Sequence, residues 1–196
     1  MPEMDREAGE LYREFCEGRA IADLSDRVKL VLEGADRVRY LNGQVTSNVT
    51  RLEAGRAQAA CVVSAKGKLQ AELWISATDD ALFVDGAAAL RDLLQPRLEK
   101  YVIADDVTID DVSDDWKLMH LFGSAPGRAL PPDVRLVASR RFLVDGTDAW
   151  IPSTMVADIL PSLIADRVQL NEQVLESIRI EHALEYCSYQ ASTGAL

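Results

Sequence analysis

Apolar residues spaced three or four positions apart predict five helices. The first runs through residues 8–16 and ends before Gly18, because glycine is common just past a helix end. The second begins after Asp36, which is expected to cap it. The buried side of this second helix is formed by Val38, Leu41, Val45 and Val49. The others cover residues 87–101, with Pro96 bending the helix, a stretch capped by Ser153 or Thr154, and a segment from Asn171 to about Leu184.

Alternating and continuous apolar runs predict the strands. Residues 69–77 alternate, so Leu73 faces one side of the sheet while Glu72 and Trp74 face the other. Gly67 precedes this strand and supplies the positive φ of a tight hairpin turn. Further strands are predicted at residues 28–32, 58–63, 82–85, 107–112, 116–122, 134–138, 142–144 and 149–151.

The order of these elements predicts the fold class. Residues 28–112 read strand, helix, strand, strand with an extra hairpin strand, helix and strand, which is the order of a ferredoxin-like sandwich. Residues 114–184 repeat this layout without repeating its residues. We therefore predict an α+β protein of two fused ferredoxin-like (βαββαβ-type) halves. The first half is residues 1–113 with the N-terminal helix, the second is 114–184, and an irregular tail covers 185–196.

Composition and charge narrow the possible partners. The 196 residues carry a formal charge of −11, so a broad basic surface for nucleic acid or an anionic membrane is not expected. Three cysteines without a CxxC pair and only two histidines predict neither a disulfide framework nor a metal site. The N-terminus carries acidic residues instead of a long apolar core, so a signal peptide or membrane span is not expected either. A reducing, cytoplasmic setting is the expectation.

Uncharged polar residues follow the second predicted helix where a surface helix usually carries Lys and Glu. Gln44, Thr46 and Asn48 are the candidates, because such side chains can line a cleft that binds a polar ligand. The same residue types also hydrogen-bond backbone groups at helix ends. From the residues alone, both interpretations stay open.

Four motifs, in order along the chain, resemble the folate-binding family that contains the glycine-cleavage T-protein (aminomethyltransferase) and YgfZ-type proteins. The first is Asp36 followed by residues 40–49, Tyr-Leu-Asn-Gly-Gln-Val-Thr-Ser-Asn-Val. The second is residues 65–69, Ala-Lys-Gly-Lys-Leu. The third is residues 100–107, Lys-Tyr-Val-Ile-Ala-Asp-Asp-Val, and the fourth residues 176–181, Glu-Ser-Ile-Arg-Ile-Glu. Together they extend over most of the chain, and the family's fused ferredoxin-like halves agree with the predicted fold.

The resemblance implies tetrahydrofolate as the ligand. Glu181 matches the glutamate of the family's Arg-x-Glu motif, and a carboxylate can accept two N–H groups from a reduced pterin. The alternative interpretation is that Glu181 is an exposed helix residue that forms an ion pair with an arginine such as Arg179. Lys66 lies in the hairpin motif at residues 65–69, and its positive charge could bind the negatively charged glutamate tail of a folate. Its alternative is a solvated turn residue. At the family's Asp-Asp pair this chain has Ala71-Glu72, so Glu72 is the candidate for the second carboxylate, or faces only water.

The resulting functional prediction is a tetrahydrofolate-binding protein of the YgfZ/T-protein type. The resemblance links YgfZ-type proteins to one-carbon metabolism, iron–sulfur enzyme maintenance and tRNA modification. The expected partner is a folate-type small molecule, without direct contact to nucleic acid or membrane. One alternative is a non-catalytic interaction domain that has lost the ligand. The other is a glycine-cleavage aminomethyltransferase, which Ala71 disfavours because its methyl group cannot polarise a folate nitrogen.

Overall fold

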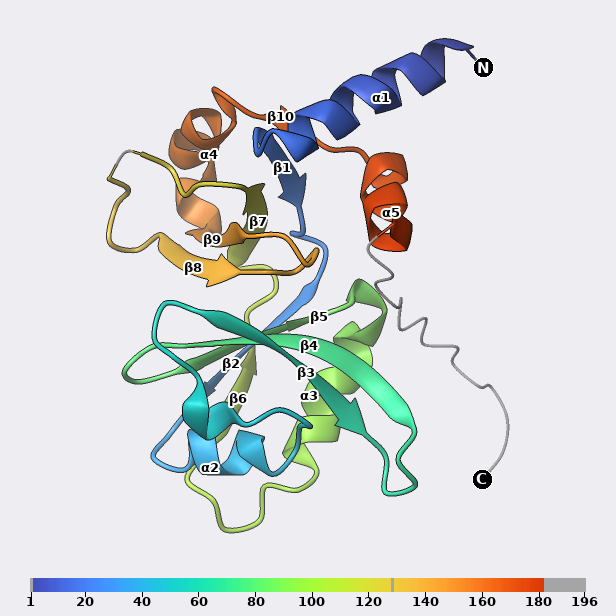
Figure 1. Cartoon of the computed structure of the whole chain (residues 1–196). Helices are drawn as coiled ribbons and strands as arrows, with labels where there is room; N and C mark the ends of the chain where they lie inside the picture. Colours follow the sequence, from blue (N-terminus) through green and yellow to red (C-terminus); the bar gives the residue numbers. More distant parts are fainter. Residues whose placement is uncertain (1, 128, 182–196) are drawn as a thin grey trace.

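The computed structural model describes residues 2–127 and 129–181 of the chain. It contains two five-stranded sheets, one above the other in Figure 1, each with helices on its outer side. The sheets have the strand orders β3-β4-β5-β2-β6 and β10-β1-β7-β9-β8. The α+β fold of two fused halves is therefore confirmed.

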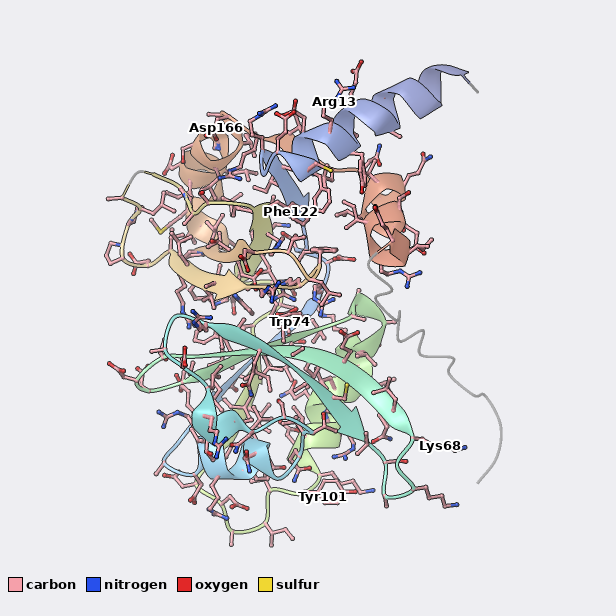
Figure 2. The ribbon with its side chains drawn as sticks, viewed as in Figure 1. Arg13, Lys68, Trp74, Tyr101, Phe122 and Asp166 are labelled. Carbon is pink, nitrogen blue, oxygen red and sulfur yellow. The ribbon has the colours of Figure 1, made fainter. Side chains whose placement is uncertain are left out.

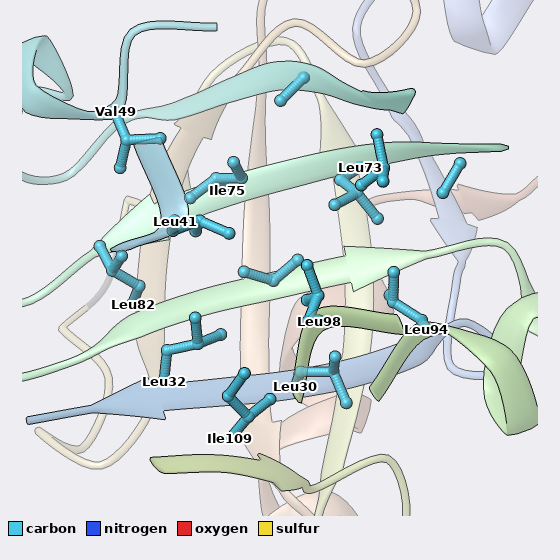
Figure 3. Close-up of a cluster of buried hydrophobic side chains, with 14 of the residues drawn as sticks. Leu30, Leu32, Leu41, Val49, Leu73, Ile75, Leu82, Leu94, Leu98 and Ile109 are labelled. Carbon is cyan, nitrogen blue, oxygen red and sulfur yellow. The ribbon is translucent and has the colours of Figure 1, made fainter. Parts of the chain in front are cut away.

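The first sheet has the predicted ferredoxin-like order, with β3 added at one edge. Its strands are β2 (Val28–Glu33), β3 (Ala57–Val63), β4 (Leu69–Ala77), β5 (Leu82–Gly86) and β6 (Thr108–Asp111). Helices α2 (Arg37–Asn42) and α3 (Arg91–Glu99) cover one face. Leucines of both helices bury their side chains against this face, which forms the core in Figure 3. The hairpin turn before β4 has Gly67 at φ 74°, as predicted.

The second sheet keeps part of the same layout. Its strands are β1 (Ala20–Asp23), β7 (Trp116–Phe122), β8 (Arg135–Ser139), β9 (Gly146–Pro152) and β10 (Val168–Gln169). Helices α1 (Pro2–Cys16), α4 (Val156–Ile164) and α5 (Glu172–Glu181) surround it, and short 3₁₀ turns lie at Val49–Arg51, Ala88–Leu90 and Ser153–Met155. Between β7 and β8, the described residues form loop and turn instead of the helix found at this point in the first half.

The N-terminal elements α1 and β1 pack with the second half of the chain and not with the first. The sequence assigns residues 1–113 to the first half, but β1 hydrogen-bonds β7 and β10, and α1 contacts β1 and α5. The physical reason is that β1 lies between two strands that come much later in the chain. Side chains from Ala8 to Ala22 therefore contribute to the second half's core, while the first sheet starts at Val28. The predicted tail at 185–196 lies outside the described residues.

Three local predictions are corrected by the structure. The helix expected to reach Val49 ends at Asn42, whose side-chain oxygen accepts the Val49 N–H at 2.9 Å. The Asp36 side chain does not cap this helix and instead accepts the Asp106 N–H at 2.9 Å. The strand expected at 142–144 is a turn, with Leu143 at φ 59°.

The two halves pack through the sheet faces that the helices leave open. Phe83 of the first sheet meets Trp150 of the second edge to face, with ring centroids 5.5 Å apart. The chain passes between the halves twice, near residues 24–27 and 112–115. Buried Lys29 holds both crossings, because its ammonium donates to the carbonyl oxygens of Ser25 (2.8 Å), Arg27 (2.9 Å) and Ser113 (3.2 Å).

None of the helices in the described part of the chain has the length and apolar character needed to cross a membrane.

Candidate functional site

A cleft of about 1260 Å³ lies between the two halves. One wall is the face of β4 that is turned away from α2 and α3 and towards the second half. The other walls come from the β1–β2 connection, the start of the segment leading to α3, the β8–β9 turn and the stretch from β10 into α5. The lining residues used below are Asp23, Asp26, Arg27, Gln70, Glu72, Trp74, Arg141, Phe142, Glu172, Glu176 and Arg179. Figure 2 shows Trp74 between the upper and lower sheets, where the two halves meet.

Strand β4 supplies three polar or aromatic side chains to the cleft from one face. Gln70, Glu72 and Trp74 are two residues apart, so the strand's alternation turns them to the same side while Ala71 and Leu73 are buried in the core. Gln70 accepts the Arg97 Nε–H at 3.0 Å. The Glu72 carboxylate is half-buried and has no hydrogen bond or ion pair to another described residue. Strand β4 therefore holds the Glu72 backbone at the cleft wall, and no donor among the described residues occupies its carboxylate oxygens.

Glu72 is the one predicted site residue that lines the cleft, and Gln44 lies one contact away. The Gln44 side-chain oxygen accepts from Arg97 Nη1 at 3.3 Å, and the same guanidinium binds Gln70. Thr46 and Asn48 instead form hydrogen bonds to backbone N–H groups. The Thr46 hydroxyl accepts the Cys61 N–H at 3.0 Å, and the Asn48 oxygen accepts the Thr50 N–H at 3.0 Å. Both contacts match the structural alternative that the sequence left open.

The remaining two predicted site residues lie away from the cleft lining. Lys66 is exposed in the hairpin turn between β3 and β4. Glu181 is exposed at the end of α5, where its carboxylate accepts the hydroxyl hydrogen of Tyr12 from α1. This bond raises the pKa of Tyr12 to about 12, chiefly because the hydroxyl hydrogen is held by Glu181. Arg179, the partner expected for Glu181, forms an ion pair with Glu176 at 2.5 Å. A ligand contact by either Lys66 or Glu181 stays a prediction.

Cys61 lies opposite Glu72 in the β3–β4 pair. Its side chain is half-buried, and burial followed by the nearby Glu72 charge raises the pKa of its thiol. A raised pKa leaves little thiolate at neutral pH, which disfavours a nucleophilic role for Cys61. Cys187 lies outside the described residues.

A buried charge network forms the floor of the cleft and was missed by the sequence analysis. Arg141, in the β8–β9 turn, binds both Asp85 oxygens at 2.9 and 2.5 Å and both Asp148 oxygens at 2.9 Å. Arg27 forms a second ion pair with Asp85. His120 Nδ1 lies 2.8 Å from Asp148 Oδ1. Two carboxylates and two guanidinium groups therefore balance, which is how a protein interior accommodates charge.

The pKa values of the network follow from this pairing. Burial alone would raise the pKa of Asp148, but the Arg141 charge, helped by His120, outweighs burial and lowers it to about 2. Burial alone would lower the pKa of Arg141, but Asp148 and Asp85 raise it above its ordinary value. Asp148 and Arg141 are thus both charged at neutral pH. Its only sequence signal was Asp85 at the end of the apolar strand predicted at 82–85, because Arg141 and Asp148 come from a distant part of the chain.

Two ferredoxin-like halves around a central cleft define a fold that solved structures share. The glycine cleavage system aminomethyltransferase T from Bartonella henselae superposes with a TM-score of 0.76 and 18% sequence identity, over 90% of this chain and 55% of that one. At this identity the likeness shows the fold.

Curated relatives extend the likeness to sequence. The tRNA-modifying protein YgfZ of Sodalis glossinidius (strain morsitans) is 30% identical over 172 residues, which cover 78% of this chain and 50% of that protein. The protein of the same name from Klebsiella pneumoniae (strain 342) is 31% identical over 109 residues, or 56% of this chain and 33% of that protein. The chain spans about half the length, or less, of the curated relatives it matches. No protein-family model matches it.

Fold and sequence together assign the chain to the T-protein/YgfZ-type family, as the four motifs predicted.

Proposed function

We propose that this chain binds a tetrahydrofolate derivative in the cleft between its two halves. Supporting this is the family of the chain, whose curated relatives are called tRNA-modifying proteins. The observation that carries it is Glu72, a carboxylate on the cleft wall that has no hydrogen-bond donor among the described residues and lies two positions from Trp74 on the same face of β4. A reduced pterin offers N–H groups along one edge, and a fixed carboxylate can accept two of them.

The role of the protein follows from ligand binding rather than from contact with RNA. A role in tRNA modification, iron–sulfur enzyme maintenance or one-carbon metabolism is proposed through the folate that the chain holds, because the charge of −11 is unfavourable for binding a phosphate backbone. The proposed setting is the cytoplasm, where reduced cysteines such as Cys16 and Cys61 are stable.

Thermal unfolding with and without tetrahydrofolate tests the proposal. A ligand that binds only the folded state at about 100 times its Kd stabilises it by about 2.7 kcal/mol, which is several degrees in Tm for a chain of this size. We expect this shift for the wild type and a clearly smaller one for Glu72→Gln, which keeps the shape and loses the charge. Glu53→Gln is the matched control, since Glu53 lies in a loop and pairs with Arg56.

The same experiment distinguishes folate binding from the alternative function, a non-catalytic interaction domain that has lost its ligand. An unchanged Tm at saturating tetrahydrofolate would leave an empty interaction domain and reject the proposal. An equal shift in the wild type and Glu72→Gln would keep folate binding but remove Glu72 from the site.

Aminomethyl transfer is the weaker alternative. In this chain the first position of the family's Asp-Asp pair is Ala71, whose side chain is 3% exposed and turned into the core with Leu73. The second position, Glu72, is the one that faces the cleft. Turnover of a methylamine-loaded lipoyl carrier in the presence of tetrahydrofolate would establish transferase activity.

A further inference from the structure

Trp74 presents an aromatic surface to the cleft at a fixed place. Its half-buried side chain lies on the cleft wall of β4, and the Arg141 guanidinium carbon is 5.0 Å from its ring centroid. A cation at this distance is attracted to the ring face. Figure 2 shows the residue at the meeting point of the two halves.

The cation beside Trp74 is itself held by the neighbouring strand. Asp85 on β5 is the residue paired with Trp74 in the β4–β5 ladder, and Asp85 binds Arg141 through both oxygens. Arg141 is further bound by buried Asp148. A ring positioned by such neighbours before a ligand arrives loses little freedom on binding, so more of the stacking energy contributes to affinity.

The charge of the lining favours one class of ligand. Among the described lining residues, three are arginines and five are carboxylates, at Asp23, Asp26, Glu72, Glu172 and Glu176. Each of the arginines already pairs with a carboxylate: Arg27 with Asp85, Arg141 with Asp85 and Asp148, and Arg179 with Glu176. The cleft therefore has negative charge in excess. It attracts N–H donors and cations, and it repels a carboxylate tail.

We propose that Trp74 and Glu72 form a recognition pair for a flat, N–H-rich heterocycle without negative charge. Trp74 stacks on the ring face, and Glu72, two residues away on the same face of β4, accepts N–H groups from the ring edge. An anionic tail attached to the ring lies outside the cleft and adds little affinity. The inference rests on the proposed folate function and specifies which part of the molecule the cleft recognises.

Calorimetric titration of the full chain with two probes tests the pair. The probes are 6-methyltetrahydropterin, which has the ring alone, and tetrahydrofolate, which adds the tail. We expect their Kd values to agree within about threefold, and Trp74→Leu to weaken both by about three- to tenfold, the range of one aromatic pair. Trp74→Phe should retain most of the affinity and guards against misfolding of the leucine variant. Trp116→Leu is the matched control, because Trp116 packs on Phe83 and Trp150 away from the cleft lining.

Each outcome decides between the two proposals. Tetrahydrofolate binding that Trp74→Leu leaves unchanged would overturn the recognition pair while folate binding stands. Tetrahydrofolate binding at least tenfold tighter than that of the ring alone would overturn the exclusion of the tail. Binding of the ring alone, lost in Trp74→Leu, without binding of tetrahydrofolate would support the pair and reject the folate function. Binding of neither probe would reject both.

Discussion

Arg141 and Asp85 form a two-point ion pair across the boundary between the halves. Arg141 lies in the β8–β9 turn of the second half and Asp85 on β5 of the first, and both side chains are almost fully buried. Since Arg141 also binds Asp148 on β9, one guanidinium connects both sheets directly below the cleft. The geometry of the cleft thus depends on this residue.

Replacing Arg141 by Met is expected to destabilise the protein by about 3 to 5 kcal/mol, because two buried carboxylates lose their shared cation. The measurement is urea unfolding at pH 7. Its matched control is the neighbouring Arg140→Met, which removes an ion pair between the exposed side chains of Arg140 and Asp145. That change should stay within about 0.5 kcal/mol. Similar losses in the two variants would mean that Arg141 does not support the boundary.

Acid should weaken the protein through Asp148. Its pKa in the folded state is about 2, against 3.8 for an ordinary aspartate, so its pairing stabilises the fold above about pH 4. As pH falls from 4 towards 2, the folded state must take up the proton that the unfolded state already binds, and about 2 kcal/mol is lost. Unfolding free energies between pH 6 and pH 2 should therefore fall more steeply in the wild type than in Asp148→Asn. Parallel pH profiles would contradict the assignment.

Lys29→Met should weaken the connection between the halves. The Lys29 ammonium is fully buried and donates to three carbonyl oxygens on the two crossing segments, so methionine leaves buried acceptors unpaired. A loss of about 2 to 4 kcal/mol is expected in urea unfolding. Lys117→Met, at an exposed position of β7, is the matched control and should be nearly neutral. A neutral Lys29→Met would show that the crossings hold without the ammonium.

The strands of the first sheet were predictable because a two-residue period needs only local sequence, whereas β1 and β10 were not predicted and residues 142–144 form a turn. This period placed Glu72 and Trp74 on one face of β4, and the structure puts both on the cleft wall. The helix after Asp36 was overextended because Val45 and Val49 continue the apolar stripe. Both do pack on the core, but from a turn closed by the Asn42 side chain, which no apolar spacing reveals.

The rest of the site could not be predicted because it depends on contacts between distant segments. Arg141 and Asp85 are 56 positions apart, and nothing local in either segment indicates the other. Lys29, inside an alternating strand, has the position of a solvent-facing residue and yet is fully buried by carbonyl groups from two crossings. Glu181 was selected by resemblance alone, and its contact with α1 needs the fold.

Tyr12 provides a spectroscopic test of what Glu181 does. Among the five tyrosines of the chain, Tyr12 should titrate near pH 12, because its hydroxyl donates to the Glu181 carboxylate. In an ultraviolet titration, Glu181→Gln should bring this pKa down towards 10, and Tyr12→Phe should remove the transition. Glu176→Gln, which breaks the pair with Arg179 one turn earlier on α5, should leave the transition in place.

Adding tetrahydrofolate to the same titration tests the ligand contact that the family resemblance implies for Glu181. A folate held by this carboxylate would compete with the Tyr12 hydroxyl, so the pKa of Tyr12 would fall at saturating ligand in the wild type. From the position of Glu181 outside the cleft lining we expect no change. A fall of the Tyr12 pKa towards 10 would overturn this expectation and place the carboxylate in the folate site.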